Sequence, residues 1–213
     1  MGKSSAVIKG FFIGLLAGLV ACTEKDPVPK PFCYLKREFP KHKYFSAFFK
    51  QKKFSFQFDL NTCYYIGDYT NNGQKRFFYF QPNLFTKFET EQVIDLIPLS
   101  AIIQMHSFTF NNSDSLNKLI KLSNDLVDED KIKADSINFI RVLNHNDRVF
   151  GTLWFLYGNV ANNFRFHMTD SVNRFVMGNV RFNCRPNYDS LRPTLDYLKV
   201  DLERMMESFK WVK

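Results

Sequence analysis

The sequence contains little glycine, proline or cysteine for its 213 residues. Nine Gly and eight Pro exclude collagen-like and low-complexity proteins. Four Cys are too few for a fold held together mainly by disulfides. No apolar run reaches the roughly 18 residues that a membrane-spanning helix needs. With 45% hydrophobic and 23% charged residues, the chain has the composition of a globular protein with its own core.

Aromatic residues and positive charge are both in excess. The chain has 25 Phe, 9 Tyr and 2 Trp, and a formal net charge of +8. Aromatic side chains favour half-buried strands and bury large areas there. The positive charge suggests an anionic partner, and nucleic acid is the first candidate to test.

The N-terminus reads as an export signal. Lys3 and Lys9 supply positive charge, and residues 11–20 (FFIGLLAGLV) form a short apolar run. The run ends in residues 19–22 (LVAC), which resemble a bacterial lipobox, where the cysteine is acylated and becomes the first mature residue. We therefore predict a lipoprotein signal peptide at 1–21, an acylated Cys22 opening a Pro-rich tether at 22–33, and a globular domain at 34–213. A plain secretory signal or a short membrane helix is the alternative.

Export changes the interpretation of the charge. Lys3 and Lys9 leave with the signal peptide, so the mature chain carries a net charge of +6. An exported protein does not meet the cytoplasmic nucleic acids, so we expect no nucleic-acid partner. We expect contact with the membrane through the lipid on Cys22 and not through a spanning segment.

Hydrophobic periodicity predicts an α+β domain. Alternation of Phe with polar residues, as at 54–60, predicts a half-buried strand, and other aromatic-rich stretches are also predicted as strands. Apolar residues at helical spacing predict two helices, and Ser113 could cap the first. Short turns between consecutive strands indicate an antiparallel sheet. We predict a single domain with a central antiparallel sheet covered by helices, similar to a PsbP/Mog1-like layered sandwich on element order alone. The predicted strands are 54–60, 76–81, 101–110, 134–143, 149–157, 164–168 and 175–183, the helices 113–127 and 190–209, and residues 85–97 are either a short helix or an insertion.

Motifs for catalysis or metal binding are absent from the sequence. The four His lie at no zinc-binding spacing, and there is no nucleotide-binding, serine-hydrolase or metalloprotease motif. Asp135, Asp170 and Asp189 could supply an acidic pair, but Asp170 and Asp189 each precede a serine at an element end, where capping explains them better. We predict no catalytic residue, no metal and no cofactor.

Three cysteines remain after Cys22 has been acylated. In an oxidising envelope one pair among Cys33, Cys63 and Cys184 could form a disulfide and leave one free thiol. Three free thiols are an equally good interpretation, and the spacing does not select a pair.

Several stretches together resemble the gliding-motility lipoprotein GldD family of Bacteroidetes. The resemblance extends from the lipobox over most of the chain and is densest from residue 132 to residue 211. The residues that carry it are Pro29–Pro31, Tyr34–Arg37, Ile132–Asp135, Val149–Gly151, Gly158–Ala161, Phe166, Thr169–Ser171, Phe175, Gly178, Pro186–Pro193, Tyr197, Asp201 and Trp211.

This resemblance implies a non-enzymatic lipoprotein of the gliding machinery. Its partners would be other gliding and type IX secretion proteins, and its place would be the cell envelope, with the outer membrane favoured. The alternative is an envelope lipoprotein that binds a glycan or an anionic ligand.

The turns in the matched stretches are the candidate partner contacts. Gly158 lies where a turn between strands would need positive φ. These turns could be purely architectural, or they could cluster at one end of the sheet as a partner surface. The candidate contact residues are Asn159, Thr169, Asp170, Ser171, Asn187, Tyr188 and Asp189.

Overall fold

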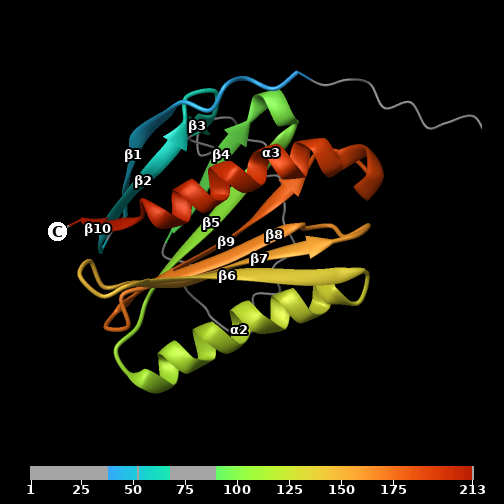
Figure 1. Cartoon of the computed structure of the whole chain (residues 1–213). Coiled ribbons are helices and arrows are strands. Elements are labelled where there is room, and N and C mark those ends of the chain that lie inside the picture. Colours follow the sequence, from blue (N-terminus) through green and yellow to red (C-terminus); the bar gives the residue numbers. More distant parts are fainter. Residues whose placement is uncertain (1–37, 52, 68–89, 213) are drawn as a thin grey trace, which may run out of the picture. The chain divides into compact units, whose positions relative to one another are not determined.

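The computed structural model describes residues 38–51, 53–67 and 90–212 (Figure 1). The chain divides into two compact units, residues 1–36 and 37–213, and every described residue lies in the second. The predicted signal peptide, Cys22, the predicted tether and the predicted strand at 76–81 lie outside the described residues. No helix in the described part of the chain is long and apolar enough to cross a membrane.

A seven-stranded antiparallel sheet forms the larger part of this unit (Figure 1). Each pair of neighbouring strands is antiparallel. In spatial order the strands are β3 (Tyr65–Gly67), β4 (Thr90–Leu96), β5 (Ala101–Thr109), β9 (Arg174–Phe182), β8 (Phe164–Thr169), β7 (Val149–Tyr157) and β6 (Ser136–Asn144). A 3-10 turn, η1 (Ile97–Leu99), joins β4 to β5.

A second sheet has three strands, in the order β1, β2, β10. β1 (Tyr44–Lys50) pairs with β2 (Ser55–Asn61), and the C-terminal β10 (Lys210–Val212) pairs with the other side of β2. The start of the domain and its end therefore meet in one sheet.

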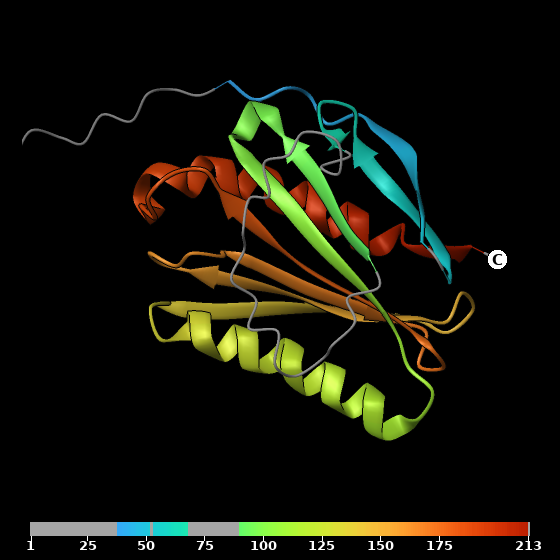
Figure 2. The same cartoon turned by 180° about the vertical axis from the view of Figure 1, so that it is seen from behind.

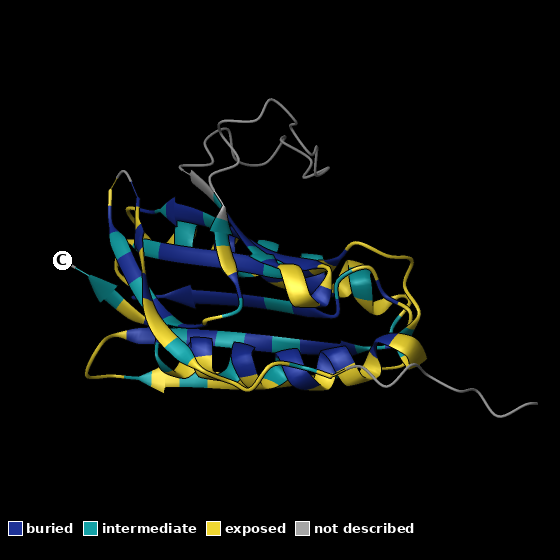
Figure 3. Cartoon of the chain, turned by 90° about the horizontal axis from the view of Figure 1, so that it is seen from above, coloured by how far each residue is buried: buried dark blue, intermediate teal, exposed yellow. Residues whose placement is uncertain are grey.

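Two helices pack on opposite faces of the larger sheet (Figure 2). Side chains along a strand point alternately to the two faces. On β9, Phe175 shares an apolar cluster with Leu119 of α2 (Ser113–Lys131). The next residue, Val176, belongs to the main core together with Leu198 of α3 (Tyr188–Glu207). Figure 3 shows the buried residues concentrated on the strands and on the inner sides of these helices.

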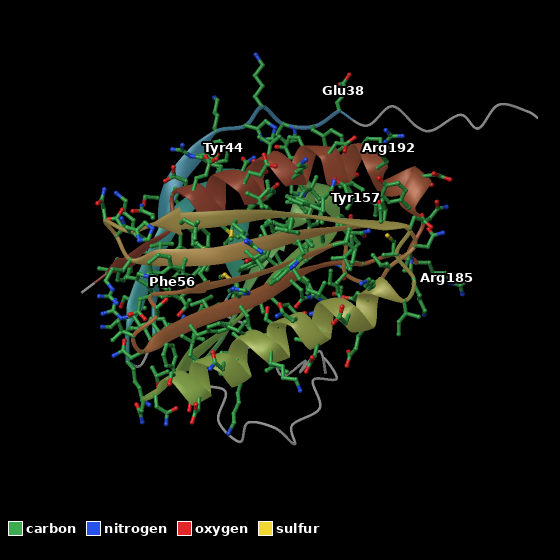
Figure 4. The ribbon with its side chains drawn as sticks, turned by 60° about the horizontal axis from the view of Figure 1, so that its bottom comes forward. Glu38, Tyr44, Phe56, Tyr157, Arg185 and Arg192 are labelled. Atoms are coloured by element: carbon green, nitrogen blue, oxygen red, sulfur yellow. The ribbon has the colours of Figure 1, made fainter. Side chains whose placement is uncertain are left out.

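Stacked phenylalanines connect the small sheet to the end of α3. Phe56, labelled in Figure 4, lies 5.3 Å from Phe49 and 5.3 Å from Phe209 between ring centroids, in both cases with nearly parallel planes. Trp211 meets Phe209 edge-on at 4.8 Å. These rings are part of the main hydrophobic core. These aromatic residues therefore form core, as the sequence predicted.

The predicted elements within the described residues are present. The α+β class, the antiparallel arrangement and both helices are confirmed. The likeness to a PsbP/Mog1-like sandwich stays a prediction. Residues 85–97 were left open as a short helix or an insertion, but their described part is strand β4 followed by one residue of η1. Strands β1, β3 and β10 were not predicted.

The first helix is capped by a residue other than the one predicted. The N-cap of α2 is Asn112, whose side chain accepts a hydrogen bond from the Ser115 N–H at 2.8 Å, so the assignment to Ser113 was wrong by one position. Asn is as good a cap as Ser, because its short side-chain oxygen reaches the free N–H groups of the first turn.

Candidate functional site

A buried carboxylate, Asp201, is the centre of a polar cluster that connects the two ends of the domain. It lies on α3 one turn after Tyr197, so the two side chains share a helix face. Asn61 ends β2 and is paired with Tyr44 of β1. Figure 4 shows Tyr44 beside α3.

Donors surround both carboxylate oxygens of Asp201. Its Oδ1 lies 2.7 Å from Nδ1 of His42 and accepts from the Tyr44 hydroxyl at 2.8 Å. The Nδ2 atom of Asn61 donates to both oxygens, at 3.2 and 3.0 Å, and the Tyr64 hydroxyl donates to Oδ2. The side chain of Asp201 is only 4% exposed. A carboxylate has about four acceptor positions, so these five contacts saturate it.

Burial keeps the tyrosines of this cluster protonated. It raises the pKa of Tyr64 far above its usual range, and the nearby negative charge of Asp201 raises it further. Burial also raises the pKa of Tyr44, together with its hydrogen bond to Asp201. The pKa of Tyr197 rises to about 12, again mainly through burial and then through the charge of Asp201. These hydroxyls therefore remain donors over the physiological pH range.

Cys63 extends the cluster toward the β2–β3 turn. Its thiol donates to Oδ1 of Asn61 at 3.2 Å, and the amide of Asn61 in turn donates to the Tyr197 hydroxyl at 3.0 Å. Burial raises the pKa of the Cys63 thiol above its usual value. The thiolate is the nucleophilic form of cysteine, so this environment does not activate Cys63.

Stacked rings cover one side of the cluster. The His42 ring lies 4.3 Å from the Tyr197 ring, and Phe39 stacks at 4.8 Å from the same ring. The side chain of His42 is 32% exposed, so it connects Asp201 to the surface.

The geometry favours a structural role for this cluster. It joins the segment before β1, the end of β2 and the middle of α3 through one saturated anion. Within the described residues, no group of His, Cys, Asp and Glu is arranged to hold a metal ion. The cluster was not predicted from the sequence, although Tyr197 and Asp201 belong to the stretch that resembles GldD. The i, i+4 spacing of these two polar residues beside the apolar stripe of the helix was the only sign in the sequence that they could act together.

The candidate contact residues separate into two groups. The Asn159 side chain accepts a hydrogen bond from the Tyr188 N–H at 2.8 Å, so the β7–β8 turn meets the start of α3. Thr169 instead pairs with Phe150 near the beginning of β7, whereas Asn159 follows the end of β7. The hypothesis that these turns cluster at one end of the sheet is therefore wrong, and their role as partner contacts stays a prediction.

The turn at residues 169–171 is held by its own side chains. The Oδ1 atom of Asp170 accepts from the backbone N–H groups of Val172, Asn173 and Arg174, each at 2.9 Å. Thr169 accepts from the Ser171 N–H at 3.0 Å. Ser171 has a φ of +59°, which is the left-handed backbone conformation found at tight turns. The expected capping role of Asp170 is confirmed.

The turn at residues 187–189 starts α3. Asn187 is the N-cap, and its side chain accepts from the Ser190 N–H. Asp189 lies in the first turn and is not the capping residue, which corrects the role expected for it. A carboxylate in the first turn still interacts favourably with the helix dipole.

His167 and the two described cysteines are the other candidate reactive groups. His167 on β8 is buried and lies 3.2 Å from the Ser123 hydroxyl on α2, and burial lowers its pKa to about 4. Cys63 and Cys184 are both free thiols, so they do not form a pair. Cys33 lies outside the described residues.

Comparison with known proteins identifies one family. The family model described as "Gliding motility lipoprotein GldD" matches residues 24–211. No curated protein and no solved structure matches the chain. The matched range contains the Asp201 cluster and all seven candidate contact residues.

Proposed function

The chain belongs to the gliding motility lipoprotein GldD family, and from this membership we propose that it is a non-enzymatic scaffold of the gliding machinery that type IX protein secretion requires. The family description makes it a gliding motility component and a lipid-anchored protein of the cell envelope. The match over residues 24–211 is the observation that carries the proposal.

The Asp201 cluster supports the non-enzymatic part of the proposal. An acid, a base or a nucleophile in catalysis needs a free position for the reacting atom. The Asp201 carboxylate is saturated, and the raised pKa of Cys63 keeps its thiol protonated. Asp170 is likewise occupied by three backbone N–H groups.

Complementation of a deletion strain tests the scaffold proposal. Deleting the gene in its host should abolish spreading and the display of secreted adhesins, and the wild-type gene should restore both. The Cys63→Ala variant should also restore both at normal protein level. Normal spreading of the deletion strain would overturn the role in gliding, whereas loss of spreading by a folded Cys63→Ala protein would overturn the non-enzymatic role.

Lipidation of Cys22 is a separate part of the proposal. The short apolar run and the Ala21–Cys22 junction support acylation of this residue, and we propose that the lipid lies in the outer membrane. The Cys22→Ala variant should move from the membrane fraction to the soluble fraction, whereas Cys33→Ala should stay with the membrane. Density-gradient separation of the two membranes then tests the outer-membrane location, and recovery in the inner membrane would contradict it.

A further inference from the structure

Strand β6 is a long edge of the seven-stranded sheet, and among the described residues no strand pairs with its outer side. It is the last strand in the sheet order and pairs with β7 over all nine of its residues without a bulge. Three of its apolar side chains are exposed: Phe139 by 54%, Ile140 by 39% and Leu143 by 67%. They point to both faces, because Ile140 has the opposite parity to the other two.

This edge lacks the features that normally prevent strand pairing. Edge strands of soluble proteins are usually short, bulged, or interrupted by proline or several charges. β6 has no proline and one charged residue, Arg141. The Arg141 guanidinium lies 5.2 Å from the centre of the Phe139 ring on the same face. The opposite edge of the sheet, β3, has only three residues. A long edge of this kind is suited to pairing with another strand.

The sequence of β6 is close to self-complementary about Ile140. In an antiparallel pair of two such strands centred there, Ser136 faces Asn144, Ile137 faces Leu143, and Ile140 faces itself. These pairs place polar with polar and apolar with apolar side chains. Two of the five distinct pairs place a polar or charged residue opposite an apolar one, namely Asn138 facing Val142 and Phe139 facing Arg141.

A cation–π contact between the two copies also favours a second copy of the chain as the partner. The same register places Arg141 of one copy opposite Phe139 of the other, twice because of the two-fold axis. Arginine beside an aromatic ring is a favourable cation–π pair. The two isologous contacts would continue the intramolecular Arg141–Phe139 pairing across the interface.

We propose that β6 pairs with β6 of a second copy, antiparallel and centred on Ile140, and so joins the two seven-stranded sheets into one. This contact places the exposed side chains of Phe139, Ile140 and Leu143 beside side chains of the second copy. It depends only on the edge strand and is independent of the proposed role in gliding.

Cysteine crosslinking in envelope fractions of cells that express the full chain tests the register. The background carries Cys33→Ser and Cys184→Ser, which removes two native thiols outside the Asp201 cluster. Opposed residues in an antiparallel pair have Cα atoms about 5 Å apart, within disulfide range. Ile140→Cys should therefore give a disulfide-linked dimer. Asn144→Cys is the matched control, because its two copies would lie about 27 Å apart along the strands.

Two further variants, tested alone and together, check the register of the pair. Ser136→Cys and Asn144→Cys should each crosslink roughly tenfold less than Ile140→Cys when expressed alone, and should crosslink with each other when coexpressed. Equal crosslinking at all three positions, no dimer with Ile140→Cys, or an adduct of Ile140→Cys to a different protein would overturn the proposal.

The mass of the purified full chain gives an independent readout. Light scattering in detergent should give a dimer for the wild-type chain and half that protein mass for Ile140→Lys. Far-UV circular dichroism confirms that the variant is folded, since the exposed position should tolerate lysine. A wild-type monomer would overturn the proposal.

Discussion

Nδ1 of His42 lies 2.7 Å from Oδ1 of Asp201, although 159 positions separate the two residues in the chain. The first residue precedes β1 and the second lies in the last helix. Their contact is one of five that Asp201 receives, and it joins the beginning of the domain to its end. Because the carboxylate is buried and saturated, its loss should affect the stability of the whole unit.

Asp201→Asn should lower the free energy of unfolding by about 2–3 kcal/mol. The substitution replaces one acceptor oxygen by an amide that donates, and this amide then faces donors such as the Tyr64 hydroxyl or Asn61 Nδ2. Denaturant unfolding measures the change. Asp196→Asn is the matched control, since Asp196 is exposed on the same helix and should change stability by less than about 0.5 kcal/mol. Equal effects of the two substitutions would refute the structural role of the cluster.

Stability should fall as the pH rises above about 10. Tyrosines in the unfolded chain lose their protons near pH 10. In the folded state burial keeps the pKa of Tyr64 well above this value and that of Tyr197 at about 12. The folded state then binds more protons than the unfolded state, so the free energy of unfolding decreases with pH.

Unfolding measured between pH 9 and 11.5 tests this dependence. Tyr64→Phe should be less stable at pH 8, because Asp201 loses one donor, and should show a shallower decline above pH 10. Tyr65→Phe, at an exposed position next in the chain, should leave the decline unchanged. A Tyr64→Phe profile parallel to that of the wild type would contradict the assignment.

A separate loss of stability should occur in acid. Burial lowers the pKa of His167 to about 4, below its unfolded value near 6.5. Between these values the unfolded state binds the proton and the folded state does not, so stability falls as pH drops from about 6.5 to about 4. His167→Gln should reduce this slope, and His145→Gln, in an exposed turn, should not. The NMR titration of the His167 ring gives the direct readout, and an apparent pKa near 6.5 would contradict it.

Gly158→Ala should destabilise the domain by about 1–3 kcal/mol. Gly158 has a φ of +122°, and a Cβ atom there would lie 2.9 Å from the backbone nitrogen of Asp135. The strain and the clash both act on the β7–β8 turn that meets α3. Val172→Ala, at an exposed turn position, is the control and should change the midpoint of thermal unfolding much less. An unchanged midpoint for Gly158→Ala would show that the turn adapts.

Local patterns predicted the regular elements well. The run at residues 149–157 coincides with β7, because a nearly continuous apolar and aromatic stretch is bounded by clear turn residues on both sides. The helix at 113–127 was found but stops four residues short, since its last turn carries charged residues and no apolar signal. Strand β10 has only three residues and forms because β2 offers it a free edge, which no local pattern reports.

The polar site was less predictable than the strands. Asp170 could be assigned to its turn, because its hydrogen-bond partners follow within four residues. The partners of Asp201 come from the segment before β1, from β1, from β2 and from the β2–β3 turn, so sequence spacing carried no information about them. The positions of the turns at 159 and 169–171 were also not predictable from spacing. Strand direction decides at which end of the sheet a turn lies, and it places these two turns at opposite ends of β7.

By itself the sequence determined the α+β class, the aromatic material of the core and the resemblance to the GldD family, because these depend on composition and short-range order; the export signal stays a prediction from the same kind of pattern. Only the tertiary structure decided that Asp201 is buried among five donor contacts and that β6 is the last of the described strands in its sheet. The burial of a side chain and the neighbours of a strand depend on contacts between segments that are distant in the sequence, so they are defined only once the chain has folded.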